Sequence, residues 1–178
     1  MIKESNLEKG ISAIIPTYKG EAFISKLLDS LINQTINPNL FEAVFIVNGE
    51  LDSTPDIIKK YQEENPQINI ILTYSDPGVS NARNHGIELI NKEYTIFIDD
   101  DDYISYNYFE KMYEYAKKDR IVIGTFYDVD QNSGEVRDSY LTPKLEKSGL
   151  FKNPYDNLRE MLTITTDKLV PTDIVKKY

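Results

Sequence analysis

The sequence predicts an α/β fold, with a mostly parallel central sheet and helices on both of its faces. Five apolar runs rich in β-branched residues begin at nearly even intervals along the chain. Segments with apolar residues three or four positions apart, as in amphipathic helices, lie between these runs. The runs are continuously apolar, which is typical of parallel strands that are buried on both faces.

The apolar runs are the expected strands, and each is short enough for a strand and too short for an average helix. They are residues 11–16, 41–47, 68–73, 94–98 and 120–126. We expect helices after the first four. The second helix should be capped by Thr54 with Pro55 in its first turn, and the third and fourth should begin at Ser80 and Ser105. Three of the helices have clear apolar faces, which are Phe23, Leu27, Leu28 and Leu31; Ile57, Ile58 and Tyr61; and Phe109, Met112, Tyr113 and Ala116.

The regular alternation ends after Phe126. Two short strands around an Asn-Ser-Gly turn at residues 132–134 predict a small antiparallel excursion. A polar stretch then leads to a helical pattern at residues 155–162, and another helix is expected near Pro171. We interpret residues 1–178 as a single domain that lacks part of its C-terminal half.

Composition narrows the classes of function. The chain has 178 residues, 40% of them hydrophobic, which is enough for one domain with a core. Its formal charge of −9 and scattered basic residues argue against nucleic acid as a partner. It has no cysteine, which is consistent with a reducing compartment. No apolar run approaches the roughly 20 residues of a membrane span, so we expect a cytoplasmic protein.

Polar residues follow each of the first four expected strands. They are residues 16–18, 48–50, 74–80 and 99–102. Ligands of open parallel sheets bind beyond the carboxyl ends of the strands, so these segments should converge on one crevice. Polar side chains, a glycine and acids fit a nucleotide and a metal better than a lipid.

Four consecutive aspartates, Asp99 to Asp102, end the fourth strand in "YTIFIDDDDYIS". Their carboxylates repel one another, and alternate residues of a strand share a face, so Asp99 and Asp101 should project together around a positive charge. Hard oxygen ligands suit Mg²⁺ or Mn²⁺. The alternative is a solvated acidic turn in which Asp102 or Ser105 caps the next helix.

Other loop residues have both functional and structural interpretations. Asn48 offers an acceptor and a donor that would suit a uracil edge, and Gly49 permits close approach of the backbone, but Asn-Gly is also a common turn. Arg83, in the first turn of a helix, could meet a phosphate, hold an aspartate or lie on the surface. His85 has no partner that suggests a catalytic role, and we assign it none.

Three segments in order resemble family 2 glycosyltransferases with a Rossmann-like GT-A fold, over about Ile11 to Ser105. They are "SAIIPTYKGEAFISKLLDSLINQT", "GVSNARNHGI" and "FIDDDDYIS". The family usually shows Asp-Asp-Gly-Ser-x-Asp after the second strand, and this chain has Val-Asn-Gly-Glu-Leu-Asp at residues 47–52. The resemblance therefore supports metal binding more strongly than base recognition.

The resemblance implies an inverting, metal-dependent transfer of a sugar from a nucleoside diphosphate sugar, which we expect to be a UDP-sugar. The acceptor would be the hydroxyl of a glycan or a lipid-linked molecule in bacterial polysaccharide synthesis, with possible peripheral association at the inner membrane face. The cofactor would be Mn²⁺ or Mg²⁺, bound by Asp101, Asp99 and Asp102. The expected nucleotide contacts are Pro16, Thr17, Tyr18, Asn48, Arg83, Asp99 and Asp100. Of these, Asp100 stands at the position that varies within the family. The general base is expected beyond Tyr178 and is not assigned.

Three other functions are compatible with parts of this pattern. A non-catalytic nucleotide-sugar binding module would have the same donor residues. A sugar-nucleotide pyrophosphorylase needs a Gly-x-Gly-Thr type of loop after the first strand, where this chain has "PTYKGE". A phospho-receiver domain needs acids at that position, where Thr17 and Tyr18 stand instead.

Overall fold

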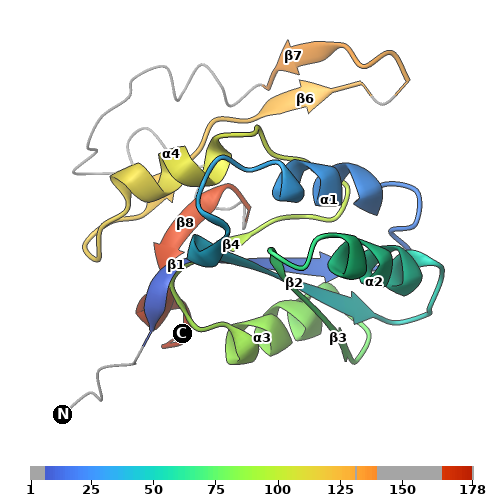
Figure 1. The fold of residues 1–178 in the computed structure, drawn as a ribbon, viewed down its shortest axis with the longest axis horizontal. Helices are drawn as coiled ribbons and strands as arrows, with labels where there is room; N and C mark the ends of the chain where they lie inside the picture. The colour runs from blue at the N-terminus through green and yellow to red at the C-terminus, as the bar shows by residue number, and fades with distance from the viewer. Residues whose placement is uncertain (1–6, 131, 140–165, 178) are drawn as a thin grey trace.

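A six-stranded sheet forms the centre of the molecule in the computed structural model, which describes residues 7–130, 132–139 and 166–177 (Figure 1). The strand order is β3-β2-β1-β4-β8-β5. Strands β1 to β4 pair in parallel, whereas β8 is antiparallel to both β4 and β5. The strands are β1 Glu8–Thr17, β2 Phe41–Asn48, β3 Asn69–Ser75, β4 Lys92–Phe97, β5 Val122–Ile123 and β8 Lys168–Pro171. The predicted mostly parallel α/β fold is confirmed.

Helices cover both faces of this sheet, as the sequence predicts. Helix α3 packs on one face, where Ala82 belongs to one buried cluster with Ile14, Val44 and Ile46, and α1, α2 and α4 lie over the other (Figure 1). The larger core cluster lies on that second side and includes Leu27, Ile58 and Phe109. The helices are α1 Ile24–Ile32, α2 Thr54–Glu64, α3 Val79–Leu89, α4 Tyr108–Tyr115 and α6 Thr172–Val175, and Pro38–Leu40 form the short 3₁₀ helix η1. None of the helices in the described ranges is long and apolar enough to cross a membrane.

The predicted antiparallel excursion after Phe126 is also present. Strands β6 (Tyr127–Val129) and β7 (Val136–Asp138) form a hairpin apart from the main sheet (Figure 1). The carboxylate of Asp130 accepts hydrogen bonds from the main chain of Asn132 and Ser133 and so fixes the turn. The helix predicted at residues 155–162 lies outside the described residues.

The expected fifth strand, residues 120–126, is wrong in its length, and one strand was missed. Only Val122–Ile123 form a strand, paired with Leu169 and Lys168 of the short strand β8, and the N–H of Gly124 adds one further hydrogen bond to the carbonyl of Asp167. Strand β8 fills the sheet between β4 and β5 and precedes α6, the helix expected near Pro171. Its four residues have no strand-like periodicity of their own, so only pairing with distant strands defines it.

Three helix starts differ from the predictions. Helix α2 includes Thr54, whose N–H is accepted by the carboxylate of Asp52 at 3.0 Å, so Asp52 supplies the capping oxygen. Helix α3 begins at Val79, one residue before Ser80. Helix α4 begins at Tyr108, because residues 105–107 form a turn in which Tyr108 N–H bonds to the carbonyl of Ser105.

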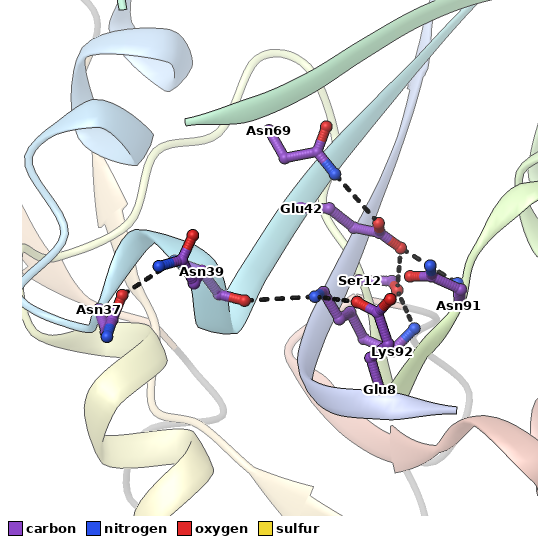
Figure 2. Close-up of polar contacts among 8 residues, drawn as sticks. All are labelled: Glu8, Ser12, Asn37, Asn39, Glu42, Asn69, Asn91 and Lys92. Atoms are coloured by element: carbon purple, nitrogen blue, oxygen red, sulfur yellow. Dashed lines mark hydrogen bonds and ion pairs between the residues drawn. The ribbon is translucent and has the colours of Figure 1, made fainter. Parts of the chain in front are cut away.

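A buried polar network joins the first four strands near the end of the sheet opposite their carboxyl ends (Figure 2). Glu42 on β2 is 2% exposed, and its carboxylate accepts hydrogen bonds from the hydroxyl of Ser12 at 2.6 Å and the main-chain N–H of Asn91 at 3.1 Å. The amide of Asn69 reaches the other carboxylate oxygen at 3.4 Å. Ser12 also accepts from the N–H of Lys92, so one side chain links β1 with both β2 and β4.

Replacing Glu42 by alanine should destabilise the fold. The hydroxyl of Ser12 would lose its acceptor while remaining buried, and an unsatisfied buried polar group costs about 1–3 kcal/mol. Urea denaturation followed by circular dichroism measures this loss. The matched control is Glu63→Ala on the exposed side of α2, which should change stability by about 0.5 kcal/mol or less. Equal losses in the two variants would contradict a structural role for the network.

Candidate functional site

The loops at the carboxyl ends of the parallel strands enclose a cleft of about 780 Å³. All four segments predicted to converge contribute to its wall, which confirms that expectation. The lining residues are Pro16, Tyr18, Asn48, Gly49, Glu50, Pro77, Gly78, Val79, Asp99, Asp100 and Asp101. We refer to this space as the first cleft.

Asn48 holds two of these loops in place from the end of β2. Its side chain is 6% exposed, and its amide nitrogen donates to the carbonyl of Thr17 at 3.0 Å. Its amide oxygen accepts from the N–H of Gly78 at 3.1 Å. Both ends of the amide are already hydrogen-bonded within the protein. The side chain is therefore better suited to holding the two loops in place than to recognising a nucleotide base.

Tyr18 presents an aromatic face to the first cleft and is 53% exposed. Gly49 lies directly against it: its φ is +80°, and a Cβ there would come within 2.9 Å of the Tyr18 ring. The ammonium of Lys19 lies 5.4 Å from the ring centroid and pairs with Glu50. Pro16 lines the cleft, whereas Thr17 is fully buried and contributes its carbonyl to Asn48.

A reciprocal pair of acids ties the loop after β1 to the loop after β2. The carboxylate of Asp52 accepts the N–H of Glu21 at 3.2 Å, and the carboxylate of Glu21 accepts the N–H of Ser53 at 3.1 Å. Burial raises the pKa of Asp52, but hydrogen bonds from Thr54 and from the main chain of Glu21 outweigh it and leave the pKa below its ordinary value. The sequence alone showed Asp52 only as one position of an altered motif.

Arg83 on α3 pairs with the first of the four aspartates. Its guanidinium lies 3.1 Å from the carboxylate of Asp99, so of the roles considered, holding an aspartate is the one seen. The side-chain Nε of Arg83 is buried and has no hydrogen-bond partner among the residues that the structure describes. Asp100 accepts the N–H of Tyr18 at 3.2 Å, which connects the aspartates to the loop after β1.

The aspartates strain one another electrostatically. Loss of hydration raises the pKa of Asp100 to about 6, and repulsion from Asp101 and Asp99 adds to this. The pKa of Asp102 is also raised to about 6, first by loss of hydration in the narrow site and then by Asp101, Asp99 and Asp167. A positive charge placed among these groups would relieve the repulsion.

The metal site expected at Asp101, Asp99 and Asp102 stays a prediction, and these three carboxylates do not form a ready three-acid group among the described residues. Within the described ranges, no three Asp, Glu, His or Cys side chains lie close enough to hold a metal ion together. Asp99 and Asp101 line the first cleft, whereas Asp102 lines a second one. One or two carboxylates completed by phosphate oxygens, a common arrangement for Mg²⁺, fit this geometry.

A second cleft of about 540 Å³ adjoins the first and shares Asp101 with it. Two residues that the sequence did not single out, Tyr108 and Asp167, line this space. Burial raises the pKa of both, and the charge of Asp167 adds to the effect on Tyr108. Asp167 precedes β8 and is far from the aspartates in sequence, so no local motif could have indicated it.

The fold places the first cleft, with its acidic residues, at the carboxyl edge of the parallel strands, where ligands of open α/β sheets bind. The model of the family described as "Glycosyl transferase family 2" matches residues 12–177. The chain therefore belongs to glycosyl transferase family 2, which confirms the resemblance.

Two curated relatives illustrate the similarity. Glycosyltransferase GlyA of Streptococcus pneumoniae is 30% identical over 155 residues, which are 82% of this chain and 22% of the relative. The poly(ribitol-phosphate) beta-glucosyltransferase of Bacillus spizizenii is 33% identical over 111 residues, 62% of this chain and 18% of the relative. The chain thus spans less than a quarter of the length of these two proteins.

Solved structures show the same GT-A fold. TarS 1–349 of S. aureus in complex with UDP-GlcNAc matches with a TM-score of 0.68 and 24% identity, over 94% of this chain and 47% of that one. The mannosyltransferase PcManGT of Pyrobaculum calidifontis, in complex with GDP-Man and Mn²⁺, matches with a TM-score of 0.50 and 21% identity. That match covers 57% of this chain and 32% of the other.

Replacing Asp102 by asparagine should stabilise the protein at about pH 8 and have little effect at about pH 4. The raised pKa means that the fold disfavours the charged carboxylate, so ionisation weakens the fold as the pH rises from the unfolded pKa of 3.8 through about 6. Asparagine is neutral throughout. Thermal denaturation of dilute, metal-free protein at both pH values measures the effect.

The exposed Asp56→Asn variant serves as the control and should show no such difference between the two pH values. A melting temperature of Asp102→Asn that stays at the wild-type value near pH 8 would contradict the electrostatic strain.

Proposed function

We propose that this protein transfers a sugar from a UDP-sugar to the hydroxyl of a glycan or lipid-linked acceptor, with inversion at the anomeric carbon and with Mn²⁺ or Mg²⁺ as cofactor. The observation that carries the proposal is the first cleft. An exposed tyrosine from the loop after β1 and three consecutive aspartates after β4 line this one space. Membership of glycosyl transferase family 2 supplies the reaction type.

The nucleotide would bind in the first cleft. The exposed ring of Tyr18 offers a flat surface for a base, and Pro16 holds the start of its loop. Asn48 and Thr17 would act by keeping the loops apart at a fixed distance, and Asp99 and Asp100 lie where ribose and diphosphate could contact them. UDP is our choice of nucleotide because TarS, which shares the fold, binds UDP-GlcNAc.

The cation would be held by Asp101 and Asp99, with the diphosphate oxygens completing its ligands. The hard carboxylate oxygens and the mutual repulsion among the four acids fit a divalent cation. Once bound, the cation neutralises charge on the departing diphosphate. Arg83 holds the carboxylate of Asp99 and would prevent it from turning away from the cleft.

The biological setting is part of the same proposal. The named relative acts on poly(ribitol-phosphate), which supports a role in the synthesis of bacterial cell-surface polymers. We place the reaction in the cytoplasm, consistent with a chain that has no cysteine, and at the membrane face if the acceptor is lipid-linked. The general base remains unassigned.

Replacing Asp101 by alanine should abolish binding of UDP in the presence of Mn²⁺ and leave the fold intact. Without that carboxylate, the cation that offsets repulsion between the acidic cleft and the diphosphate loses a ligand. Isothermal titration of UDP with Mn²⁺, and again with EDTA, measures the effect. Asp56→Ala on α2 is the matched control. Wild-type affinity in the variant, or in EDTA, would refute metal-dependent binding.

Replacing Arg83 by alanine should weaken UDP binding about tenfold while barely affecting uridine, because Arg83 acts through Asp99 on the diphosphate region. Arg83→Lys, which keeps the charge, should recover part of the loss. Titrations with UDP and with uridine separate the two contributions. A variant that loses affinity for both ligands equally would place Arg83 near the nucleoside instead.

A further inference from the structure

The second cleft has aromatic walls that come from three separate parts of the chain. Phe23 precedes α1, Tyr103 follows the aspartates, and Tyr127 begins β6 of the hairpin. Their exposed fractions are 38%, 48% and 54%. Exposed aromatic rings that gather around a hollow mark a binding site more often than scattered surface residues do.

The charges of this cleft restrict its ligand. Its described lining contains four carboxylates, from Asp101, Asp102, Asp128 and Asp167, and one ammonium group, from Lys26. Even with the proposed cation bound at Asp101, three carboxylates face one ammonium group, so a phosphate or carboxylate ligand would be repelled. Neutral hydroxyl groups, by contrast, can donate hydrogen bonds to carboxylates without any charge to be compensated.

The second cleft lies next to the first, so a ligand bound in it would be close to the sugar donor proposed for the first cleft. Asp101 lines both spaces, so a molecule in the second cleft lies next to whatever occupies the first. Aromatic faces can pack against the C–H faces of sugar rings, while the acids of the lining can accept hydrogen bonds from the ring hydroxyls.

We propose that the second cleft binds the acceptor through an uncharged pyranose ring, packed on Tyr127 and Phe23 with hydroxyl groups directed to Asp102 and Asp167. This inference rests on the proposed function and goes beyond it, because it names the acceptor's site and chemical class. It also distinguishes this chain from an enzyme whose acceptor contact is a polyol phosphate.

Saturation-transfer NMR tests the proposal, because it detects weak ligands. The probes are methyl β-D-glucopyranoside, methyl N-acetyl-β-D-glucosaminide and glycerol 3-phosphate, each mixed with the protein, UDP and Mg²⁺. Wild-type protein should transfer saturation to at least one pyranoside and not to glycerol 3-phosphate. Tyr127→Ala and Phe23→Ala should reduce the pyranoside signal about threefold to tenfold, as expected for loss of an aromatic contact.

Two control variants make the result specific. Tyr127→Phe keeps the ring and should retain the signal, as should Tyr115→Ala, which removes a 62% exposed tyrosine at the end of α4 outside both clefts. The UDP signal should persist in every variant, because neither Phe23 nor Tyr127 lines the first cleft.

Three outcomes would overturn the inference. They are the absence of any pyranoside signal in the wild type, a signal unaffected by both alanine variants, and stronger transfer to glycerol 3-phosphate than to the pyranosides. Absence of UDP binding in the wild type is a separate outcome, which strikes the proposed donor and leaves the pyranoside measurement readable on its own.

Discussion

The buried amide of Asn48 is the constraint on which the geometry of the first cleft depends. Parallel strands end at one edge of the sheet, but the loops beyond that edge have no ladder of hydrogen bonds to hold them together. Asn48 replaces that ladder with one side chain, which bonds to the main chain at Thr17 on one side and at Gly78 on the other. A buried amide with both ends satisfied is costly to displace, so the two loops keep a fixed separation.

The remaining loops are tied to this frame by carboxylates. Asp100 accepts from the main chain of Tyr18, Asp52 accepts from the main chain of Glu21, and the carboxylate of Glu21 accepts from the main chain of Ser53, which ties the loops after β1 and β2 together. The same ties keep acidic side chains close together in a partly dehydrated site, where loss of hydration and then mutual repulsion raise the pKa of Asp100 and Asp102. The loops thus hold an excess of negative charge around the four aspartates, and the guanidinium of Arg83 offsets part of this charge at Asp99.

Much of the fold up to the four aspartates was predictable because its signals are local. Continuous apolar runs define strands β1 to β4, and the polar residues after each run must meet at one edge of a parallel sheet. The predictions that were wrong concern features that depend on pairing between distant strands or on local competition between polar groups. Strand β8 exists only by pairing with β4 and β5, and Thr54 lies inside α2 rather than before it because the carboxylate of Asp52 accepts the N–H of Thr54 at the start of the helix.

The residues of the two clefts also differ in whether a local sequence signal indicates them. The aspartates were visible as a charge run after a strand, whereas Asp167 reaches the second cleft only through the fold, before β8. The sequence correctly indicated Asn48 as a residue of the first cleft. It could not indicate the hydrogen-bond partners of Asn48, because the same residue can face solvent or be bonded at both ends of its amide. Only the burial seen in the structure distinguishes the two cases.

The two clefts differ in how they are built, and this difference bears on what each can recognise. The first is framed by loops fixed to the main sheet through buried or main-chain hydrogen bonds, so its shape is set by the core. One wall of the second is the β6–β7 hairpin, whose strands pair with each other and with no other strand of the described residues, and whose β7 residues are exposed. A two-stranded hairpin has little stability of its own in water. Substitutions on this wall therefore disturb the core little, and the contacts around Tyr127 can change while the first cleft keeps its geometry.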